Sequence, residues 1–379
     1  MKKRVLFAIE SLSGGGAEKV LTTIVKNIDY TRFDVTVLTI VETGVYLEEV
    51  KKYCKVISIL PEYGKLNNPV DRLRYKLDYK KVYNSDCKKV YRKYIKEVYD
   101  VEIAFVEGFV TKLIANSWNQ KSKKYTWVHT DMIENNYADS NYINIEEEQY
   151  IYRKYDNIFT VSEYVGKEFI KKFGKEFAEK LRTQYNPVDS KEIEKLSKEK
   201  IKDEYQAKIK LISIGRLVNQ KGYDRLVSIV EKLNQKGYDF EIWILGEGEQ
   251  KKELQDFIEK HRLQNCFKLK GFKNNPYPYI IKADAFVCSS RSEGFSTVVT
   301  EALILNKPIF TTDCSGMKEL FGNKKCGIIC KNSSEGIYEM LDYIMKDCDF
   351  LKYEKECLTR KNEFILEKRM IEIEGILNE

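Results

Sequence analysis

Residues 285–305 read Ala-Phe-Val-Cys-Ser-Ser-Arg-Ser-Glu-Gly-Phe-Ser-Thr-Val-Val-Thr-Glu-Ala-Leu-Ile-Leu. A strand-like apolar run leads through a Gly-Phe turn into a helix-like run, with Ser296 as the expected N-cap. The N-terminus of such a helix attracts anions, because its free N–H groups and the positive end of its dipole point the same way. Glu293 lies in the turn and Glu301 lies about one helical turn into the helix. Carboxylates on both sides of an anion cradle suit a ligand with hydroxyl groups at its ends and a diphosphate between them. The alternative is that Glu293 and Glu301 are two solvent-exposed glutamates without a binding role, because the spacing alone does not distinguish the two cases.

A second segment, Leu211-Ile-Ser-Ile-Gly-Arg-Leu-Val-Asn-Gln-Lys-Gly222, points to the same chemistry. An apolar strand ends here in Gly215, which lets the next helix approach closely. Arg216 and Lys221 follow in the loop, and open α/β sheets bind ligands at the carboxyl ends of their strands. Arginine suits bidentate contact with phosphate oxygens, and lysine supplies a compact positive charge.

The order of these segments resembles that of the retaining GT-B glycosyltransferases of glycosyltransferase family 4. The other matching segments are Gly14-Gly-Gly-Ala-Glu-Lys19, His129 in Trp-Val-His-Thr-Asp, Leu245-Gly-Glu-Gly248 and Asp313-Cys-Ser-Gly-Met-Lys-Glu319. Taken alone, the glycine run at 14–16 could be a plain tight turn; it lacks the GxGxxG spacing of an NAD site.

The resemblance implies transfer of a sugar from a nucleotide diphosphate-sugar to a saccharide or lipid-linked saccharide, with retention at the anomeric carbon. We expect a UDP-sugar rather than a GDP-sugar, although no residue near Gly271–Lys273, where the base is expected, separates uridine from guanosine. A bacterial surface-polysaccharide pathway is expected. The leaving phosphate would itself accept the acceptor's proton, so no nucleophile is assigned. No cofactor or metal ion is expected, because cationic side chains and helix amides would stabilise the leaving diphosphate without one.

Four residues are expected to be catalytic, namely His129, Arg216, Lys221 and Glu293. Arg216, Lys221 and the amides around Ser296 and Thr297 would stabilise the leaving diphosphate by preorganised electrostatics. The resemblance places Glu293 on a hydroxyl of the transferred sugar, Glu301 on the donor ribose and His129 beside the transferred sugar. The expected donor-binding residues are Gly15, Gly16, Gly215, Gly246, Gly271, Phe272, Phe295, Ser296, Thr297 and Glu301.

Short apolar runs alternate with helix-like segments in both halves of the chain, which predicts parallel sheets covered by helices. The predicted strands are residues 4–9, 34–40, 56–60, 101–106, 125–129, 157–161, 210–214, 240–245, 267–269, 285–288, 309–311 and 327–330. The expected fold is α/β of the GT-B class, with two Rossmann-like doubly wound domains facing across a cleft. We expect an acceptor-binding domain at residues 1–188 and a donor-binding domain at 189–348. A charged helix at 191–205 follows the boundary, and a final helix at about 349–379 is expected to cross back onto the first domain.

Composition excludes several classes of protein. The chain has 379 residues, enough for two domains with full cores, and its 43% hydrophobic content excludes a mainly disordered protein.

The apolar run at the N-terminus ends at Glu10 and reads as a first strand rather than a signal peptide. The nine cysteines have no paired spacing and read as reduced thiols of a cytoplasmic protein. Asp347-Cys-Asp349 reads as a surface feature rather than a metal motif.

Residues 51–100 hold 14 Lys and Arg against 6 Asp and Glu. Within them, basic and tyrosine residues interleave over 72–96, which is typical of a helix face on an anionic membrane, although a solvated helix would look the same. We therefore expect a cytoplasmic protein with peripheral contact with the inner face of the cell membrane. No recognition motif accompanies the charge, so nucleic acid is not an expected partner.

Other functions remain open from the sequence alone. A retaining glycoside hydrolase needs two carboxylates about 5–5.5 Å apart, whereas a turn and a helix start separate Glu293 from Glu301. A nucleotide-sugar epimerase or hydrolase on the same fold and a non-catalytic peripheral membrane module are the remaining alternatives. Acceptor specificity is expected in the loops at 107–111 and 131–142.

Overall fold

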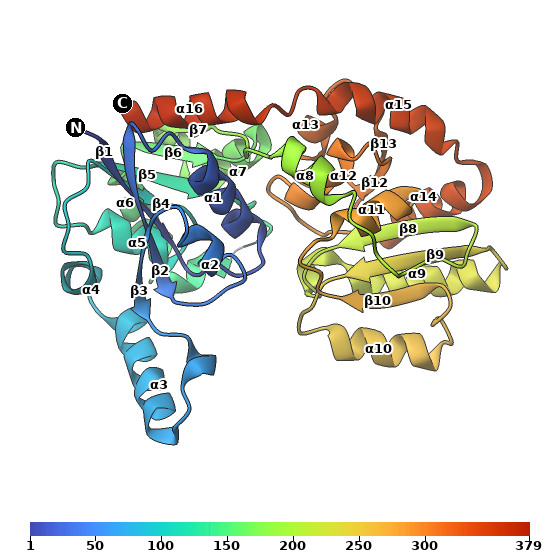
Figure 1. Ribbon diagram of the computed structural model, residues 1–379, viewed down its shortest axis with the longest axis horizontal. Coiled ribbons are helices and arrows are strands. Elements are labelled where there is room, and N and C mark those ends of the chain that lie inside the picture. The colour runs from blue at the N-terminus through green and yellow to red at the C-terminus, as the bar shows by residue number, and fades with distance from the viewer. Residues whose placement is uncertain (136) are drawn as a thin grey trace. The chain divides into compact units, whose positions relative to one another are not determined.

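The computed structural model describes residues 1–135 and 137–379, and it divides into two compact units (Figure 1, coloured by residue number). Unit 1 comprises residues 1–187 and 367–379, and unit 2 comprises residues 188–366. Asn136, in a loop that we expect to set acceptor specificity, lies outside the described residues.

Unit 1 is built on a parallel sheet in the order β3-β2-β1-β4-β5-β6-β7. The strands are β1 Lys3–Ile9, β2 Phe33–Val41, β3 Lys55–Leu60, β4 Val101–Ala104, β5 Lys123–Val128, β6 Asn157–Thr160 and β7 Leu181–Thr183. The first six confirm the predicted strands, whereas β7 is short and only partly buried and has no clear sequence signal. Because β1 pairs with β2 on one side and β4 on the other, the strand order reverses between β1 and β4.

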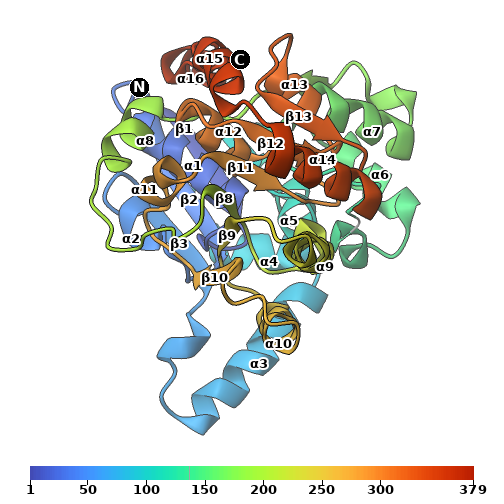
Figure 2. The ribbon, with the colours of Figure 1, turned by 90° about the vertical axis from the view of Figure 1, so that its right-hand side faces the viewer.

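Helices complete unit 1, and their bounds follow from their buried faces and caps. In α1, for example, the buried residues Val20, Leu21, Ile24 and Val25 recur at helical spacing. The helices are α1 Gly16–Asn27, α2 Leu47–Val50, α3 Pro69–Asn84, α4 Cys87–Tyr94, α5 Phe109–Ala115, α6 Ile145–Arg153, α7 Glu163–Phe173 and α16 Leu366–Asn378, with 3-10 turns η1 Tyr63–Lys65, η2 Tyr137–Asn141 and η3 Lys175–Phe177. In both views α3 and η1 project from the rest of unit 1 (Figures 1 and 2).

Unit 2 repeats the architecture with a six-stranded parallel sheet in the order β10-β9-β8-β11-β12-β13. The strands are β8 Ile209–Ile214, β9 Phe240–Leu245, β10 Phe267–Gly271, β11 Ala285–Cys288, β12 Ile309–Thr312 and β13 Gly327–Cys330, all six as predicted. The strand order reverses between β8 and β11, which pair directly. The helices are α8 Ser190–Leu196, α9 Tyr223–Gln235, α10 Lys251–Lys260, α11 Tyr277–Lys282, α12 Thr297–Ile304, α13 Met317–Phe321, α14 Ser334–Asp347 and α15 Phe350–Lys361, with the 3-10 turn η4 Asn219–Lys221.

Two helix predictions were wrong in extent. The charged helix expected at 191–205 ends at Leu196, and Tyr205 lies outside it, stacked on Trp243 with ring centroids 3.7 Å apart. The returning helix expected at 349–379 is two helices, and α15 belongs to unit 2. Cys357 on α15 is buried there, and its thiol donates to the carbonyls of Lys307 and Cys326. Only α16 returns to unit 1, and its residue Glu374 pairs with Arg32 at 2.8 Å.

The described part of the chain contains no helix that is both long and apolar enough to cross a membrane. The basic segment at 72–96 does not form one continuous helix. It is divided into α3 and α4, with Asp86 capping the start of α4.

Candidate functional site

The strongest candidate site lies in unit 2 where the strand order reverses. The loops after β8 and β11 meet there, and a reversal of this kind opens a crevice at the carboxyl ends of the strands. The loop after β8 contains Arg216 and Lys221, and the loop after β11 contains Glu293. The sheet topology thereby brings together two segments that are about 70 residues apart in sequence.

Lys221 and Glu293 form a largely buried ion pair at this reversal, with the Lys221 Nζ atom 2.6 Å from Glu293 Oε1. The two side chains are 17% and 8% exposed, so solvent screens the pair weakly. Burial alone would lower the pKa of Lys221, but the Glu293 carboxylate outweighs it and the net pKa is raised. Lys221 is therefore a fixed cation. The Ser290 hydroxyl donates to the same oxygen of Glu293 at 2.6 Å.

Close packing of glycines sets the path of these loops. Gly246 has a φ of +151°, and a Cβ there would lie 1.9 Å from the carbonyl oxygen of Gly215. Gly222 has a φ of +67°, and its Cβ would lie 2.2 Å from the carbonyl oxygen of Ser289. Side chains at either position would push the loops apart, so these glycines are required for the pair to form.

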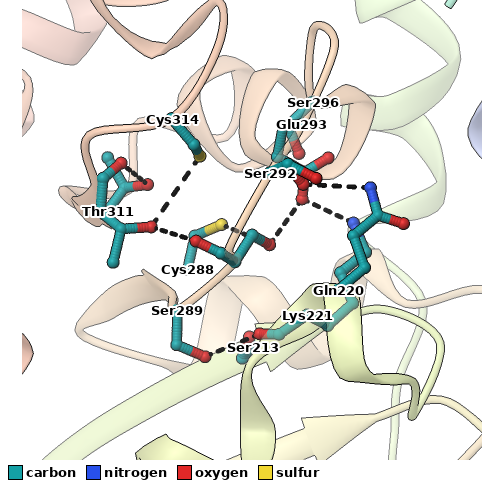
Figure 3. Close-up of polar contacts among 12 residues, drawn as sticks. Ser213, Gln220, Lys221, Cys288, Ser289, Ser292, Glu293, Ser296, Thr311 and Cys314 are labelled. Atoms are coloured by element: carbon teal, nitrogen blue, oxygen red, sulfur yellow. Dashed lines mark hydrogen bonds and ion pairs between the residues drawn. The ribbon is translucent and has the colours of Figure 1, made fainter. Parts of the chain in front are cut away.

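The N-terminus of α12 lies beside the ion pair, as Figure 3 shows by the neighbouring side chains of Ser296 and Glu293. Ser296 occupies the N-cap position as predicted, but its side chain does not cap the helix. Its hydroxyl is buried and has no hydrogen-bond partner among the described residues. Since the first-turn N–H groups of a helix also have no intrahelical acceptor, this turn offers donors to an anion.

A group of residues that sequence reasoning did not identify holds the two loops together. Arg291 donates to both carboxylate oxygens of Asp224, and Arg225 donates to the carbonyls of Ser289 and Ser290. Gln220 donates to the carbonyl of Ser292 at 3.0 Å, and its side chain points toward that segment in Figure 3. These bonds span 64 to 72 residues of sequence, which is why no local pattern indicated them.

The other predicted donor-binding residues of unit 2 lie on different elements: α12 and the loop before it, the end of β10 and the loop after β8. Glu301 is 2% exposed on α12 and lies close to Tyr277, because the pKa of Tyr277 is raised mainly by burial and further by the Glu301 charge. Phe295 is buried, whereas Phe272 is 46% exposed after Gly271 at the end of β10. Arg216 is exposed on the loop that carries Lys221, and Thr297 is the first residue of α12.

The remaining predicted residues lie in unit 1 at the carboxyl ends of its strands. Gly15 is the N-cap of α1 and Gly16 is its first residue. His129 follows β5, and the carboxylate of Glu107 accepts hydrogen bonds from its backbone N–H at 2.7 Å and from that of Thr130 at 2.8 Å. The hydroxyl of Tyr137 donates to the same carboxylate at 3.1 Å. Glu107 thus organises this region, although the sequence indicated only its loop.

His129 lies where burial lowers the pKa of its imidazole, and the nearby Glu107 charge and a hydrogen bond with the Phe105 backbone only partly oppose this. Its Nε2 atom is buried and has no hydrogen-bond partner among the described residues. A ligand hydroxyl could therefore occupy that position. No group of three or more His, Cys, Asp or Glu side chains suited to a metal ion occurs within residues 1–135 and 137–379.

A family model described as "Glycosyl transferases group 1" matches residues 194–357, which lie almost entirely in unit 2. A Campylobacter jejuni relative named N-acetylgalactosamine-N,N'-diacetylbacillosaminyl-diphospho-undecaprenol 4-alpha-N-acetylgalactosaminyltransferase is 28% identical over 373 residues, which cover 96% of each chain. An uncharacterized glycosyltransferase of Methanocaldococcus jannaschii is 34% identical over 209 residues, covering 53% of this chain and 51% of that protein.

Solved structures show the same fold. HepE of Anabaena, crystallised with UDP and glucose, superposes with a TM-score of 0.75 at 18% identity and 99% coverage of both chains. TarM of S. aureus superposes with a TM-score of 0.72 at 14% identity, covering 100% of this chain and 99% of that one. The predicted GT-B fold class, with two Rossmann-like α/β units, is confirmed.

Proposed function

We propose that this chain is a GT-B glycosyltransferase that moves a sugar from a nucleotide diphosphate-sugar to a saccharide or lipid-linked saccharide, with retention at the anomeric carbon. The observation that carries the proposal is the Lys221–Glu293 pair, 2.6 Å apart at the strand reversal beside the N-terminus of α12. The match of residues 194–357 to the group 1 family supports it.

The chemistry of this site suits a departing nucleoside diphosphate. As the sugar–phosphate bond breaks, negative charge grows on the diphosphate, and a fixed cation and first-turn N–H groups stabilise it without reorganisation. Lys221 supplies the cation, Arg216 supplies a second on the same loop, and Ser296 with Thr297 supplies the donors. Glu293 then binds a hydroxyl of the transferred sugar while holding Lys221 in place.

The proposed identities of donor and acceptor rest on relatives. HepE was crystallised with UDP-glucose, and the name of the C. jejuni relative specifies a diphospho-undecaprenol-linked acceptor. We propose a UDP-sugar donor, a saccharide acceptor that can be lipid-linked, and a place in bacterial surface-polysaccharide synthesis. We further propose that unit 2 binds the donor, through Glu301 to the ribose and Gly271–Phe272 to the base, and that unit 1 binds the acceptor. We propose that His129 lies beside the transferred sugar and that Gly15–Gly16 approach the donor's phosphates or the acceptor.

Membrane contact is also proposed, and α4 suits it better than α3. The buried residues Cys87, Val90 and Tyr91 lie on one face of α4, so the basic residues between them face outward. In α3, by contrast, charged and apolar side chains are not segregated on opposite faces.

A donor panel tests the proposed activity. The protein is incubated with labelled UDP- and GDP-sugars, with and without saccharide acceptors, in excess EDTA and in its absence. Transfer that persists in EDTA is expected. Sugar release or epimerisation without transfer would favour an epimerase or hydrolase, and no turnover with any donor would favour a non-catalytic module. Loss of transfer in EDTA would overturn the metal-independent mechanism.

A further inference from the structure

Ser290 lies at the centre of a buried chain of hydrogen bonds in the loop after β11. The residue is 1% exposed. Its hydroxyl donates to Glu293 Oε1 at 2.6 Å, and the thiol of Cys288 donates to the Ser290 hydroxyl oxygen at 3.3 Å. Burial raises the pKa of the Cys288 thiol, so the thiol keeps the proton that it donates. The hydroxyl proton of Ser290 is thereby directed toward Glu293.

The backbone of Ser290 is fixed as well. Its carbonyl accepts a hydrogen bond from the Thr312 hydroxyl at 2.6 Å and another from the Arg225 guanidinium at 2.9 Å. Thr312 is the last residue of β12 and Arg225 lies on α9, so two elements outside the loop hold Ser290. A hydroxyl supported in this way can hold its acceptor in one orientation.

The two oxygens of the Glu293 carboxylate therefore differ. The Lys221 Nζ atom and the Ser290 hydroxyl both contact Oε1, each at 2.6 Å. A carboxylate oxygen offers about two lone pairs, so these two donors fill Oε1. The side chains of Cys288, Glu293 and Lys221 lie together in Figure 3. Oε2 is then the atom that Glu293 offers to a hydroxyl of the transferred sugar.

We propose that Ser290 is a positioning residue that orients the Glu293 carboxylate toward the transferred sugar, and that Cys288 directs the Ser290 hydroxyl. Lys221 neutralises the carboxylate, but an ammonium group is a compact point charge, and the terminal torsion of glutamate is soft. A second donor on the same oxygen, from a different loop, restricts that torsion. The inference deepens the proposed function and rests on its assignment of Glu293 to a hydroxyl of the transferred sugar.

The competing interpretation is that Ser290 only satisfies a buried charge. Ser117 of unit 1 is a serine of that kind, because it is 5% exposed and its hydroxyl donates to the buried Glu102 at 3.1 Å. The two interpretations differ in the ligand that is affected. Loss of a positioning residue weakens binding of the sugar part of the donor, whereas loss of a structural contact does not distinguish a nucleotide-sugar from its nucleotide.

Binding of donors and of their nucleotides tests the proposal. Dissociation constants of the full chain are measured for UDP-glucose, UDP-N-acetylglucosamine and GDP-mannose, with UDP and GDP as references. Ser290→Ala is expected to raise the ratio of the nucleotide-sugar constant to the nucleotide constant about five- to fifty-fold, as loss of a hydrogen bond to a charged group does. Cys288→Ala should raise the ratio about two- to five-fold, and Cys288→Ser, which keeps a donor, should leave it nearly unchanged.

Ser117→Ala is the matched control, since it removes the same type of bond from unit 1 and should leave the ratio unchanged. Melting curves show whether each variant is folded, and the two Cys288 variants carry the test if Ser290→Ala is not. An unchanged ratio in Ser290→Ala, or an equal loss of affinity for nucleotide and nucleotide-sugar, overturns this proposal alone. Equal ratios in Cys288→Ala and Cys288→Ser overturn the role of Cys288. Failure of the unchanged chain to bind any of the nucleotide-sugars overturns the proposed function and this assignment with it.

Discussion

At the scale of single residues, burial decides what each ionisable group of the candidate sites can do. Lys221 and Glu293 exclude most solvent from their contact, so the charge of the lysine is fixed. Glu10 is the opposite case. Burial raises its pKa to about 7, and the hydrogen bond from Tyr83 only partly opposes this. One region thus holds a permanent cation and the other holds a carboxyl that titrates near neutrality.

Variants of Lys221 and Glu293 should show that Lys221 contributes to turnover independently of its contribution to stability. Lys221→Met is expected to lower turnover about 10²–10³-fold, as loss of a single oxyanion donor does. It should also lower the melting temperature, because the Glu293 charge is left buried without its partner. In the double variant Lys221→Met with Glu293→Gln, stability should recover and turnover should not. Recovery of turnover in the double variant would contradict the assigned role.

The matched control is Lys318→Met, since Lys318 pairs with Asp313 but is 74% exposed. An exposed pair contributes about 0–1 kcal/mol, so this variant should melt and turn over almost as the unchanged chain does. Rates and melting curves of all four proteins measure both effects together.

Glu10 should give unit 1 a pH-dependent stability. Its folded-state pKa lies above its ordinary value of 4.5, so the unfolded chain binds fewer protons between about pH 4.5 and 7. Stability contributed by this group therefore falls as pH rises through that window. Glu10→Gln removes the effect, and its free energy of unfolding should exceed that of the unchanged chain by about 1–3 kcal/mol at pH 8. Denaturation at pH 5 and pH 8 measures this; an equal difference at both values would contradict it.

At the scale of elements, loops without regular structure are held by glycine and by long-range polar contacts. Gly222 starts α9 in the left-handed region, directly against the carbonyl of Ser289. Gly316 at the start of α13 packs in the same way, since its Cβ would lie 2.5 Å from the carbonyl of Gly294. The turn that carries Glu293 is therefore packed by glycines from two other loops.

Two glycine variants should separate this steric contact from backbone strain. Gly222 and Gly237 have similar φ values of +67° and +77°, but a Cβ at Gly237 meets nothing within 4 Å. Gly237→Ala should cost only the left-handed conformation, about 1–2 kcal/mol. Gly222→Ala should cost more and should also weaken donor binding, because it displaces Ser289 and the segment toward Glu293. Melting temperatures and donor affinity measure the two effects, and equal losses would refute the packing argument.

At the scale of the whole molecule, the end of the chain is shared between the units. Contacts of α15 lie within unit 2, and α16 completes unit 1. Met370, Ile373, Ile376 and Leu377 of α16 are buried, and the Tyr125 hydroxyl donates to the carbonyl of Ile376. Unit 1 thus requires residues 367–379, which follow the whole of unit 2 in the sequence.

Two isoleucines on α16 test this dependence. Ile373 is 0% exposed and Ile371 is 71% exposed. Ile373→Ala should destabilise unit 1 by about 2–5 kcal/mol, because it leaves a cavity in a packed interface. Ile371→Ala should change stability by about 0.5 kcal/mol or less. Protease susceptibility of residues 1–187 with each variant measures the outcome, and similar cleavage in both would argue against a structural role for α16.

Much of the fold could be predicted because its signals are local. Twelve of the thirteen strands appeared in the sequence as short apolar runs, since a strand buried on both faces must be apolar throughout. The position of Ser296 at a helix start was predictable for the same reason. The short strand β7 was missed because its three residues are only partly buried and form no apolar run. The early end of α8 was missed because the charged sequence up to Tyr205 gave no local stop, although Tyr205 stacks on Trp243 outside the helix.

The sequence by itself determined that two parallel sheets exist and that Lys221 and Glu293 follow strand ends. Only the tertiary structure decided that these two side chains meet, that Arg225, Arg291 and Gln220 hold their loops, and that Glu107 organises the region of His129. The physical reason is the distance along the sequence over which each interaction acts. Strand and helix signals arise from neighbouring residues, whereas these contacts join residues 22 to 72 positions apart, whose proximity depends on the order of strands in the sheets.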